Sequence, residues 1–296
     1  MKLEKLITET RNSNTMDLDQ LSIKDVVKIM NEEDKKVPLA IESEIGKITQ
    51  VIEKTIQTFN KGGRLIYIGA GTSGRLGILD AAECVPTFGV DSTMVQGLIA
   101  GGEKAMTLAI EGAEDSSALG VEDLKRIELS SNDMVVGIAA SGRTPYVIGG
   151  LDYANEIGAG TSSISCNKDA VISKHAKIAI EIDAGPEILT GSTRLKAGTS
   201  QKLVLNMIST GAMIGIGKVY KNLMVDVKPT NLKLIERSKK IIMEATGCSH
   251  DVASHYFKHS DQDVKLAIVM LLTGDSKEES EEKLIRNAGF VRKCLI

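Results

Sequence analysis

The sequence predicts an α/β fold in which a doubly wound parallel sheet is followed by a small all-helical domain. Three observations support this prediction. Apolar runs of strand length alternate with helix-length segments through the middle of the chain, two of the runs end in loops of glycine and hydroxyl residues, and strand-like patterns stop after residue 231. Such alternation is typical of parallel sheets with helices on both faces and ligands beyond the carboxyl ends of the strands.

The elements follow in order along the chain. Residues 23–59 have a helical pattern that is interrupted near Pro38, so we expect residues 1–60 to form a helical lead segment that packs on residues 61–228 and completes one domain with them. The predicted strands are 64–69, 94–99, 133–139, 160–165 and 177–182, and the predicted helices are 146–157, 193–220, 232–246, 249–259, 261–272 and 276–288. The last four helices make up a small C-terminal domain of residues 232–296.

The first predicted strand leads directly into Gly71, Thr72 and Ser73, which open a helix. Glycine lets the backbone approach a ligand closely, and a helix N-terminus offers unpaired N–H groups and a positive dipole end. Together with two hydroxyls, these features favour a bound phosphate. The same stretch also fits the G-x-G-x-x-G pattern of dinucleotide sites, but Asp91, the acidic residue at the right spacing, precedes the next strand instead of ending it.

A second loop of this kind, with Ser141, Gly142, Arg143 and Thr144, follows the third predicted strand and opens the helix of 146–157. Two such loops favour one phosphate held from two strand ends. Arg143 either adds positive charge there or faces solvent. The alternative is that the glycines only form the tight strand-to-helix turns that any α/β protein needs.

Two glutamates are candidates for acid/base chemistry. Glu83 lies late in the apolar helix after the first loop, three residues before Pro86, where the negative helix end and apolar neighbours favour a carboxyl that delivers a proton. An ordinary solvent-facing carboxylate is equally compatible with this position. Glu114 follows Gly112 and a small residue that leave room for a ligand, whereas its neighbours Asp115 and Ser116 are better suited to capping the next helix.

Composition excludes several classes of protein. The 296 residues are 42% hydrophobic and carry a net charge of −3, so there is no basic field for nucleic acid or an anionic membrane. Aromatic residues make up only 3% and tryptophan is absent, so sugar recognition would have to be polar. No apolar stretch in the sequence is long enough to span a bilayer, and we expect a cytoplasmic protein.

Cysteines and histidines give no metal-site pattern. The four cysteines are far apart, which indicates neither a disulfide framework nor a zinc ribbon and fits a reducing compartment. Cys248, His250, His255 and His259 fall within twelve residues, but they lack a matching pair of ligands, so we interpret them as surface residues of a helix.

Seven stretches of the chain, in order and over almost its whole length, resemble the bacterial N-acetylmuramic acid 6-phosphate etherases. They are Leu6-Ile-Thr-Glu-Thr-Arg-Asn, Ile68-Gly-Ala-Gly-Thr-Ser-Gly-Arg-Leu, Asp80-Ala-Ala-Glu-Cys-Val-Pro-Thr-Phe-Gly, Ile99-Ala-Gly-Gly-Glu, Glu111-Gly-Ala-Glu-Asp-Ser, Ala140-Ser-Gly-Arg-Thr-Pro and Pro186-Glu-Ile-Leu-Thr-Gly-Ser-Thr-Arg-Leu-Lys-Ala-Gly-Thr. More distantly, the two loops resemble the sugar isomerase (SIS) fold, which the glucokinase regulatory protein shares.

The resemblance implies cleavage of the D-lactyl ether of N-acetylmuramic acid 6-phosphate, by elimination and then hydration, to N-acetylglucosamine 6-phosphate and D-lactate. It implies that Glu83 protonates the departing lactate and later activates water, and that Glu114 acts at C2, although the swapped assignment stays open. Glu187, Ser192 and Lys196 are weaker candidates for lining the sugar site. No metal or other cofactor is implied, and the family resemblance implies a homodimer with its site near the subunit boundary.

Two other classes share parts of this pattern. A sugar-phosphate-sensing module would need only the phosphate loops, and an aldose-ketose isomerase on the same fold would share the C2 chemistry. A DNA-binding regulator is disfavoured, because residues 1–60 carry 9 basic and 11 acidic residues.

Overall fold

A computed structural model of the chain describes residues 6–229 and 231–296. It divides into two compact units. The first contains the residues up to Ala81 together with Thr93–Ser209, and the second contains Ala82–Ser92 together with Thr210–Ile296. The sheet and both glycine loops belong to the first unit, and the C-terminal helices belong to the second.

The first unit is built on the predicted parallel sheet. Its five strands are β1 (Leu65–Gly69), β2 (Val95–Ile99), β3 (Met134–Ile138), β4 (Gly160–Ser165) and β5 (Ile178–Glu181). They pair in the order β2-β1-β3-β4-β5, and every pairing is parallel. Each strand lies within its predicted range, so the α/β prediction is confirmed.

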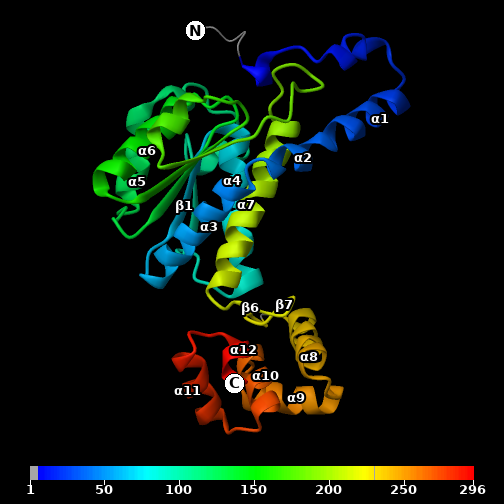
Figure 1. Cartoon of the computed structure of the whole chain (residues 1–296), viewed down its shortest axis with the longest axis vertical. Helices are drawn as coiled ribbons and strands as arrows, with labels where there is room; N and C mark the ends of the chain where they lie inside the picture. The colour runs from blue at the N-terminus through cyan, green and yellow to red at the C-terminus, as the bar shows by residue number, and fades with distance from the viewer. Residues whose placement is uncertain (1–5, 230) are drawn as a thin grey trace. The chain divides into compact units, whose positions relative to one another are not determined.

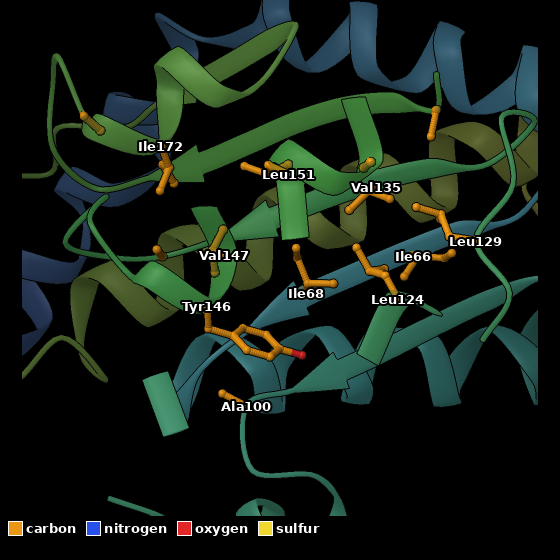
Figure 2. Packing of buried hydrophobic residues seen from close by; sticks show 14 residues of the cluster. Ile66, Ile68, Ala100, Leu124, Leu129, Val135, Tyr146, Val147, Leu151 and Ile172 are labelled. Atoms are coloured by element: carbon orange, nitrogen blue, oxygen red, sulfur yellow. The ribbon is translucent and has the colours of Figure 1, made fainter. Parts of the chain in front are cut away.

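Helices α5 (Ser117–Arg126) and α6 (Pro145–Ile157) cover one face of this sheet (Figure 1). Alternate strand residues face them, because successive side chains of a strand point to opposite faces. Figure 2 shows Ile66 and Ile68 of β1 beside Leu124 of α5 and Val147 and Leu151 of α6, and all five side chains are fully buried. This core holds the carboxyl ends of β1 and β3 in fixed positions.

The lead segment forms three helices, α1 (Ile23–Asp34), α2 (Lys36–Glu42) and α3 (Ile45–Asn60). Pro38 does not interrupt the pattern itself. It occupies the third position of α2, where a missing backbone N–H costs no hydrogen bond, and the breaks fall on either side of α2. Residues before α1 bind the segment that precedes α7, since the side chains of Asn12 and Thr15 donate hydrogen bonds to the carbonyls of Pro186 and Ile188.

Two long helices begin in the first unit. Helix α4 (Gly71–Phe88) follows β1, and helix α7 (Lys196–Gly215) follows β5 and a loop. Two short 3-10 turns, η5 (Glu103–Met106) and η6 (Ala113–Asp115), lie between β2 and α5. The prediction of one helix over 193–220 is wrong at its end. The chain leaves α7 with Gly217 at a φ of +79° and forms a two-stranded antiparallel hairpin of β6 (Val219–Tyr220) and β7 (Leu223–Met224).

The second unit is helical after this hairpin, as predicted. Its helices are α8 (Leu232–Thr246), α9 (His250–His259), α10 (Val264–Thr273), α11 (Lys277–Arg286) and α12 (Val291–Cys294). A separate apolar core joins α8, α9 and α10 to Val225 and Val227, which lie before α8. Residues 82–92 belong here as well: a Cβ added to Gly89 would lie 2.1 Å from the carbonyl oxygen of Asp226.

Candidate active site

The first glycine loop joins β1 to α4 with almost no intervening chain. Gly71 adopts a φ of +53°, a left-handed conformation that glycine accommodates best. A Cβ on Gly74 would lie 2.6 Å from the Ile99 side chain, so the helix start packs directly against the end of β2. The first N–H groups of α4 have no acceptor within the helix and lie at its positive end, which makes the loop a cradle for an anion.

The second loop occupies the same edge of the sheet, because β1 and β3 are neighbouring parallel strands. Gly142 has a φ of +72°, and a Cβ there would lie 2.4 Å from that of Ala170. Within the described residues, the hydroxyls of Ser141 and Thr144 have no hydrogen-bonding partner, although Thr144 stands at the N-cap of α6. The chain crosses from β2 over β1 to β3, so the two loops flank the point where the strand order reverses, the usual ligand site of such sheets.

A cavity of about 240 Å³ opens between the first loop and the segment that connects β2 to α5. Its charged groups are Arg75, Glu111 and Glu114, and its other lining residues are Ala70, Gly71, Ala100, Ala105, Leu108, Ala109, Ile110 and Gly112. Of the predicted site residues, Gly71 and Glu114 line this cavity. The others do not.

Arg75 fixes one wall of the cavity. Its Nε donates a hydrogen bond of 2.9 Å to the carbonyl of Met106, and one terminal nitrogen donates to the carbonyls of Ala105 and Leu108 at 2.7 and 3.2 Å. Sequence reasoning did not select Arg75 or Glu111, although both lie in motifs that carry the family resemblance. The available signal was the arginine near a helix N-terminus, where a cation opposes the helix dipole.

The two predicted acid/base glutamates occupy different surroundings. Glu114 is an exposed residue of η6 and follows Gly112, whose φ of +75° turns the chain at the cavity. As expected, Ser116 rather than Glu114 caps α5, since its hydroxyl accepts the N–H of Leu119. Glu83 is an exposed residue of α4, in the part of that helix that belongs to the second unit.

Glu187 and Lys196 lie in the interior at the start of α7. The Glu187 carboxylate, only 1% exposed, accepts the backbone N–H groups of Lys196 and Ala197 at 2.9 Å each. The Lys196 ammonium group donates hydrogen bonds to Glu33 Oε2 at 2.7 Å and to the carbonyl of Ala184 at 2.9 Å. These contacts tie α7 to the lead segment. Ser192, also predicted to line the sugar site, is half-buried in the turn before α7.

The electrostatics of this interior cluster follow from burial and hydrogen bonding. Burial alone would raise the pKa of the Glu33 carboxyl, but hydrogen bonds from Lys196, Lys36 and Asn14 outweigh it and lower the pKa to about 2. For Glu187, burial dominates and raises the pKa, against the two backbone N–H groups that it accepts. Glu33 is therefore an ionised partner of Lys196 at neutral pH.

Within residues 6–229 and 231–296, no group of three or more His, Cys, Asp or Glu side chains is arranged to hold a metal. His255 and His259 stack on each other in α9, with ring centroids 3.9 Å apart. None of the helices in this part of the chain has the length and apolar character needed to cross a membrane.

Comparison with known families agrees with this geometry. Residues 47–155 match the glucokinase regulatory protein N-terminal SIS domain, and residues 121–210 match the SIS domain. The parallel sheet with its two glycine loops at one edge is thus that of a SIS-domain protein.

Full-length relatives define the family more closely. The chain is 65% identical to N-acetylmuramic acid 6-phosphate etherase 2 of Enterococcus faecalis and 64% identical to the protein of the same name from Lactiplantibacillus plantarum, and each alignment covers 100% of both chains. It is also 64% identical to the N-acetylmuramic acid 6-phosphate etherase of an Exiguobacterium species, over 99% of this chain and 100% of that one. The chain belongs to the N-acetylmuramic acid 6-phosphate etherase family.

Proposed function

We propose that this protein cleaves the D-lactyl ether bond of N-acetylmuramic acid 6-phosphate, with water, to N-acetylglucosamine 6-phosphate and D-lactate. The observation that carries the proposal is the identity of 64–65% to etherases along the whole chain. The anion cradle at the end of β1 and the carboxylate-bearing cavity beside it support the same reading, because the substrate has a phosphate at one end and needs acid/base groups at the other.

The phosphate is assigned to the two loops at the ends of β1 and β3. The backbone N–H groups of Gly71, Thr72 and Ser73 would bind its oxygens at the positive end of α4. Ser141, Gly142 and Thr144 would complete the shell from the second loop, and Arg143 adds charge there. The unpartnered hydroxyls of Ser141 and Thr144 support this assignment, since each has a proton to donate.

The reaction needs two proton-transfer groups. In the open-chain aldehyde the proton on C2 is acidic, so a carboxylate can remove it; lactate then leaves C3 as it takes up a proton, and water adds back at C3. We assign the C2 proton to Glu114, which lines the cavity beside the first loop. Glu83 is assigned to the leaving lactate and, as a carboxylate, to the incoming water.

Glu83 acts, in this proposal, on a substrate held by a second copy of the chain. Glu83 lies eleven positions after Thr72 in one continuous helix, which is a rise of about 16 Å at 1.5 Å per residue. The phosphorus and C3 of the sugar are five bonds apart, roughly 7 Å when extended. A phosphate on the first N–H groups of α4 lies beyond the N-terminus of the helix, on the side away from Glu83. Even with the length of the glutamate side chain added, C3 therefore stays out of reach of Glu83 of the same copy.

A homodimer is supported by the surface around this helix. Leu79, which is 51% exposed, lies one turn before Glu83, and Leu76 lies a further turn back on the same face of α4. A second copy that covered this apolar stripe would also bury Glu83, and would bring it close to the phosphate loop of that second copy. We also place the protein in the cytoplasm, consistent with cysteines that form no disulfide in the part of the chain that the structure describes.

The proposal is tested by incubating the protein with N-acetylmuramic acid 6-phosphate in isotopically labelled water. We expect release of D-lactate, with solvent hydrogen at C2 and solvent oxygen at C3 of the product. Glu83→Gln and Glu114→Gln should each lower lactate release by about 100-fold or more, since one general acid or base contributes 10²–10⁴-fold, while N-acetylglucosamine 6-phosphate still binds.

The two alternative classes give different results in the same experiment. An isomerase would convert an aldose phosphate to a ketose phosphate without releasing lactate. A sensing module would bind the sugar phosphate and leave it unchanged. Full lactate release by both glutamine variants would show that these glutamates are not the catalytic groups.

A further inference from the structure

Gln201 of α7 reaches the first glycine loop from the side. Its side chain is fully buried, and its Oε1 accepts a hydrogen bond of 2.9 Å from the Ser73 hydroxyl. The helix is close to the loop here as well, since a Cβ on Gly198 would lie 3.4 Å from the Thr72 methyl group. Gln201 is thus the side chain through which α7 touches a residue assigned to the phosphate.

The donors and acceptors at this contact do not balance. Ser73 has one hydroxyl proton and gives it to Gln201. The Nε2 of Gln201 is buried and has no hydrogen-bonding partner among the residues that the structure describes. In this arrangement Ser73 has no proton left for a phosphate oxygen, and a buried amide N–H group has no acceptor.

Rotating the Gln201 amide by half a turn would free the Ser73 proton and give Nε2 an acceptor, with Oε1 moved to the former position of Nε2. Nε2 would then donate to Ser73 Oγ, and the Ser73 proton would be free to point at a phosphate oxygen. We propose that Gln201 is a positioning residue for the phosphate site, which sets the direction of the Ser73 hydroxyl and turns it into a donor when the sugar phosphate binds. The inference rests on the assignment of the phosphate to the loop of Gly71–Ser73.

A second hydrogen bond between the same two helices offers a comparison. Ser209 of α7 donates to Asp80 Oδ1 of α4 at 3.1 Å, and Asp80 also accepts the Tyr67 hydroxyl at 2.9 Å. This contact lies two turns of α7 beyond Gln201, away from the loop. It joins the helices without touching a phosphate-binding group, so a purely structural role predicts similar behaviour for Ser209 and Gln201.

The test is a double-mutant cycle on ligand affinity. The dissociation constant of N-acetylglucosamine 6-phosphate would be measured by calorimetry for the wild type, Ser73→Ala, Gln201→Leu and the double variant. We expect Ser73→Ala to weaken binding by about 10-fold when position 201 is glutamine. When position 201 is leucine, the same substitution should weaken binding by only about 3-fold or less, because a hydroxyl that is not oriented contributes less. The control cycle pairs Ser73→Ala with Ser209→Ala, and there the two effects on affinity should multiply independently.

Gln201→Glu provides a second measurement if the leucine variant does not fold, since glutamate has nearly the same shape. At pH 8 its carboxylate would accept the hydrogen bond from the Ser73 hydroxyl and would also repel the phosphate, so binding should weaken by about 30-fold or more. The result that bears on Ser73 is that Ser73→Ala should weaken binding no further in this background. The inference is overturned if Ser73→Ala costs the same factor in every background, or if it costs nothing in the wild type. Release of D-lactate by the wild type, measured separately, reports on the proposed function and does not depend on the cycle.

Discussion

Lys196 illustrates how one buried charge is accommodated in this fold. Its side chain is 1% exposed and its ammonium group is bound by Glu33, which is 3% exposed and comes from a helix 163 positions earlier in the sequence. Removing either partner alone would leave a charge in the interior, and such losses cost about 3–5 kcal/mol. The ion pair therefore fixes the position of the lead segment relative to the start of α7.

The first prediction concerns the pH dependence of stability. The folded-state pKa of Glu33, about 2, lies below its ordinary value of 4.5, so its stabilising effect is complete above about pH 5 and is lost as the pH falls toward 2. The shift corresponds to on the order of 3 kcal/mol. We expect the double variant Glu33→Leu with Lys196→Met to lose less unfolding free energy than the wild type between pH 5 and pH 2, by about this amount.

Denaturant unfolding at a series of pH values measures this difference. Glu33→Gln alone serves as the matched control, because it leaves Lys196 buried without its carboxylate and should destabilise the protein at neutral pH. Equal acid sensitivity of the double variant and the wild type would mean that the pair has little influence on acid stability.

At the scale of elements, Arg75 joins a helix to a loop. Its three hydrogen bonds to the carbonyls of Ala105, Met106 and Leu108 hold the segment that leads to Glu111 and Glu114 against the start of α4. The segment has little regular structure of its own beyond η5 and η6. Arg75 thus determines where the cavity wall lies relative to the phosphate loop.

We therefore expect Arg75→Ala to lower kcat/KM for lactate release by about 100-fold, the order of loss that a misplacement of about 1 Å can cause. Arg75→Lys should recover only part of this, because an ammonium group cannot present the planar fork of donors that reaches three carbonyls. Steady-state kinetics measure the loss of kcat/KM, and thermal unfolding measured in parallel shows whether the variant is still folded at the assay temperature. Wild-type kinetics in Arg75→Ala would exclude this role.

Sequence patterns predicted the ranges of the helices and strands more accurately than the surroundings of individual site residues. The five strands and the four long C-terminal helices follow from local apolar periodicity, which the residues of each element carry themselves. The placement of Glu187 and Lys196 in the interior depends on Glu33 and on the backbone of α7, and no local pattern connects those positions. The β6–β7 hairpin was missed for a related reason, since its two short strands follow a helix of the same apolar character.

Across the whole molecule, the second unit is assembled from two separate stretches of the chain. Val225 and Val227, before α8, are buried against its helices, and Gly89 packs on the backbone of Asp226. A chain that ended at residue 228 would therefore expose apolar side chains of its own remaining segment. We expect this truncated form to aggregate or to unfold at markedly lower temperature than the full chain; size-exclusion chromatography and thermal unfolding measure this, and a truncated form as stable as the full chain would contradict it.

The last prediction concerns the proposed dimer. It follows from the distance between Thr72 and Glu83 along α4, from which we inferred that Glu83 acts on the substrate of the other copy. If each site takes Glu114 from one copy and Glu83 from the other, a mixed dimer of Glu83→Gln and Glu114→Gln subunits contains one site with both glutamates and one with neither. Random mixing of equal amounts by unfolding and refolding would give half mixed dimers, so about a quarter of wild-type lactate release should return.

Each variant refolded alone is the control and should stay inactive. When both glutamates of a site come from the same copy, every site in the mixture lacks one of them, and no activity returns. Persistent inactivity in a mixture shown by chromatography to contain dimers would place Glu83 and Glu114 of one chain in the same site, and would require the phosphate to bind away from the N-terminus of α4.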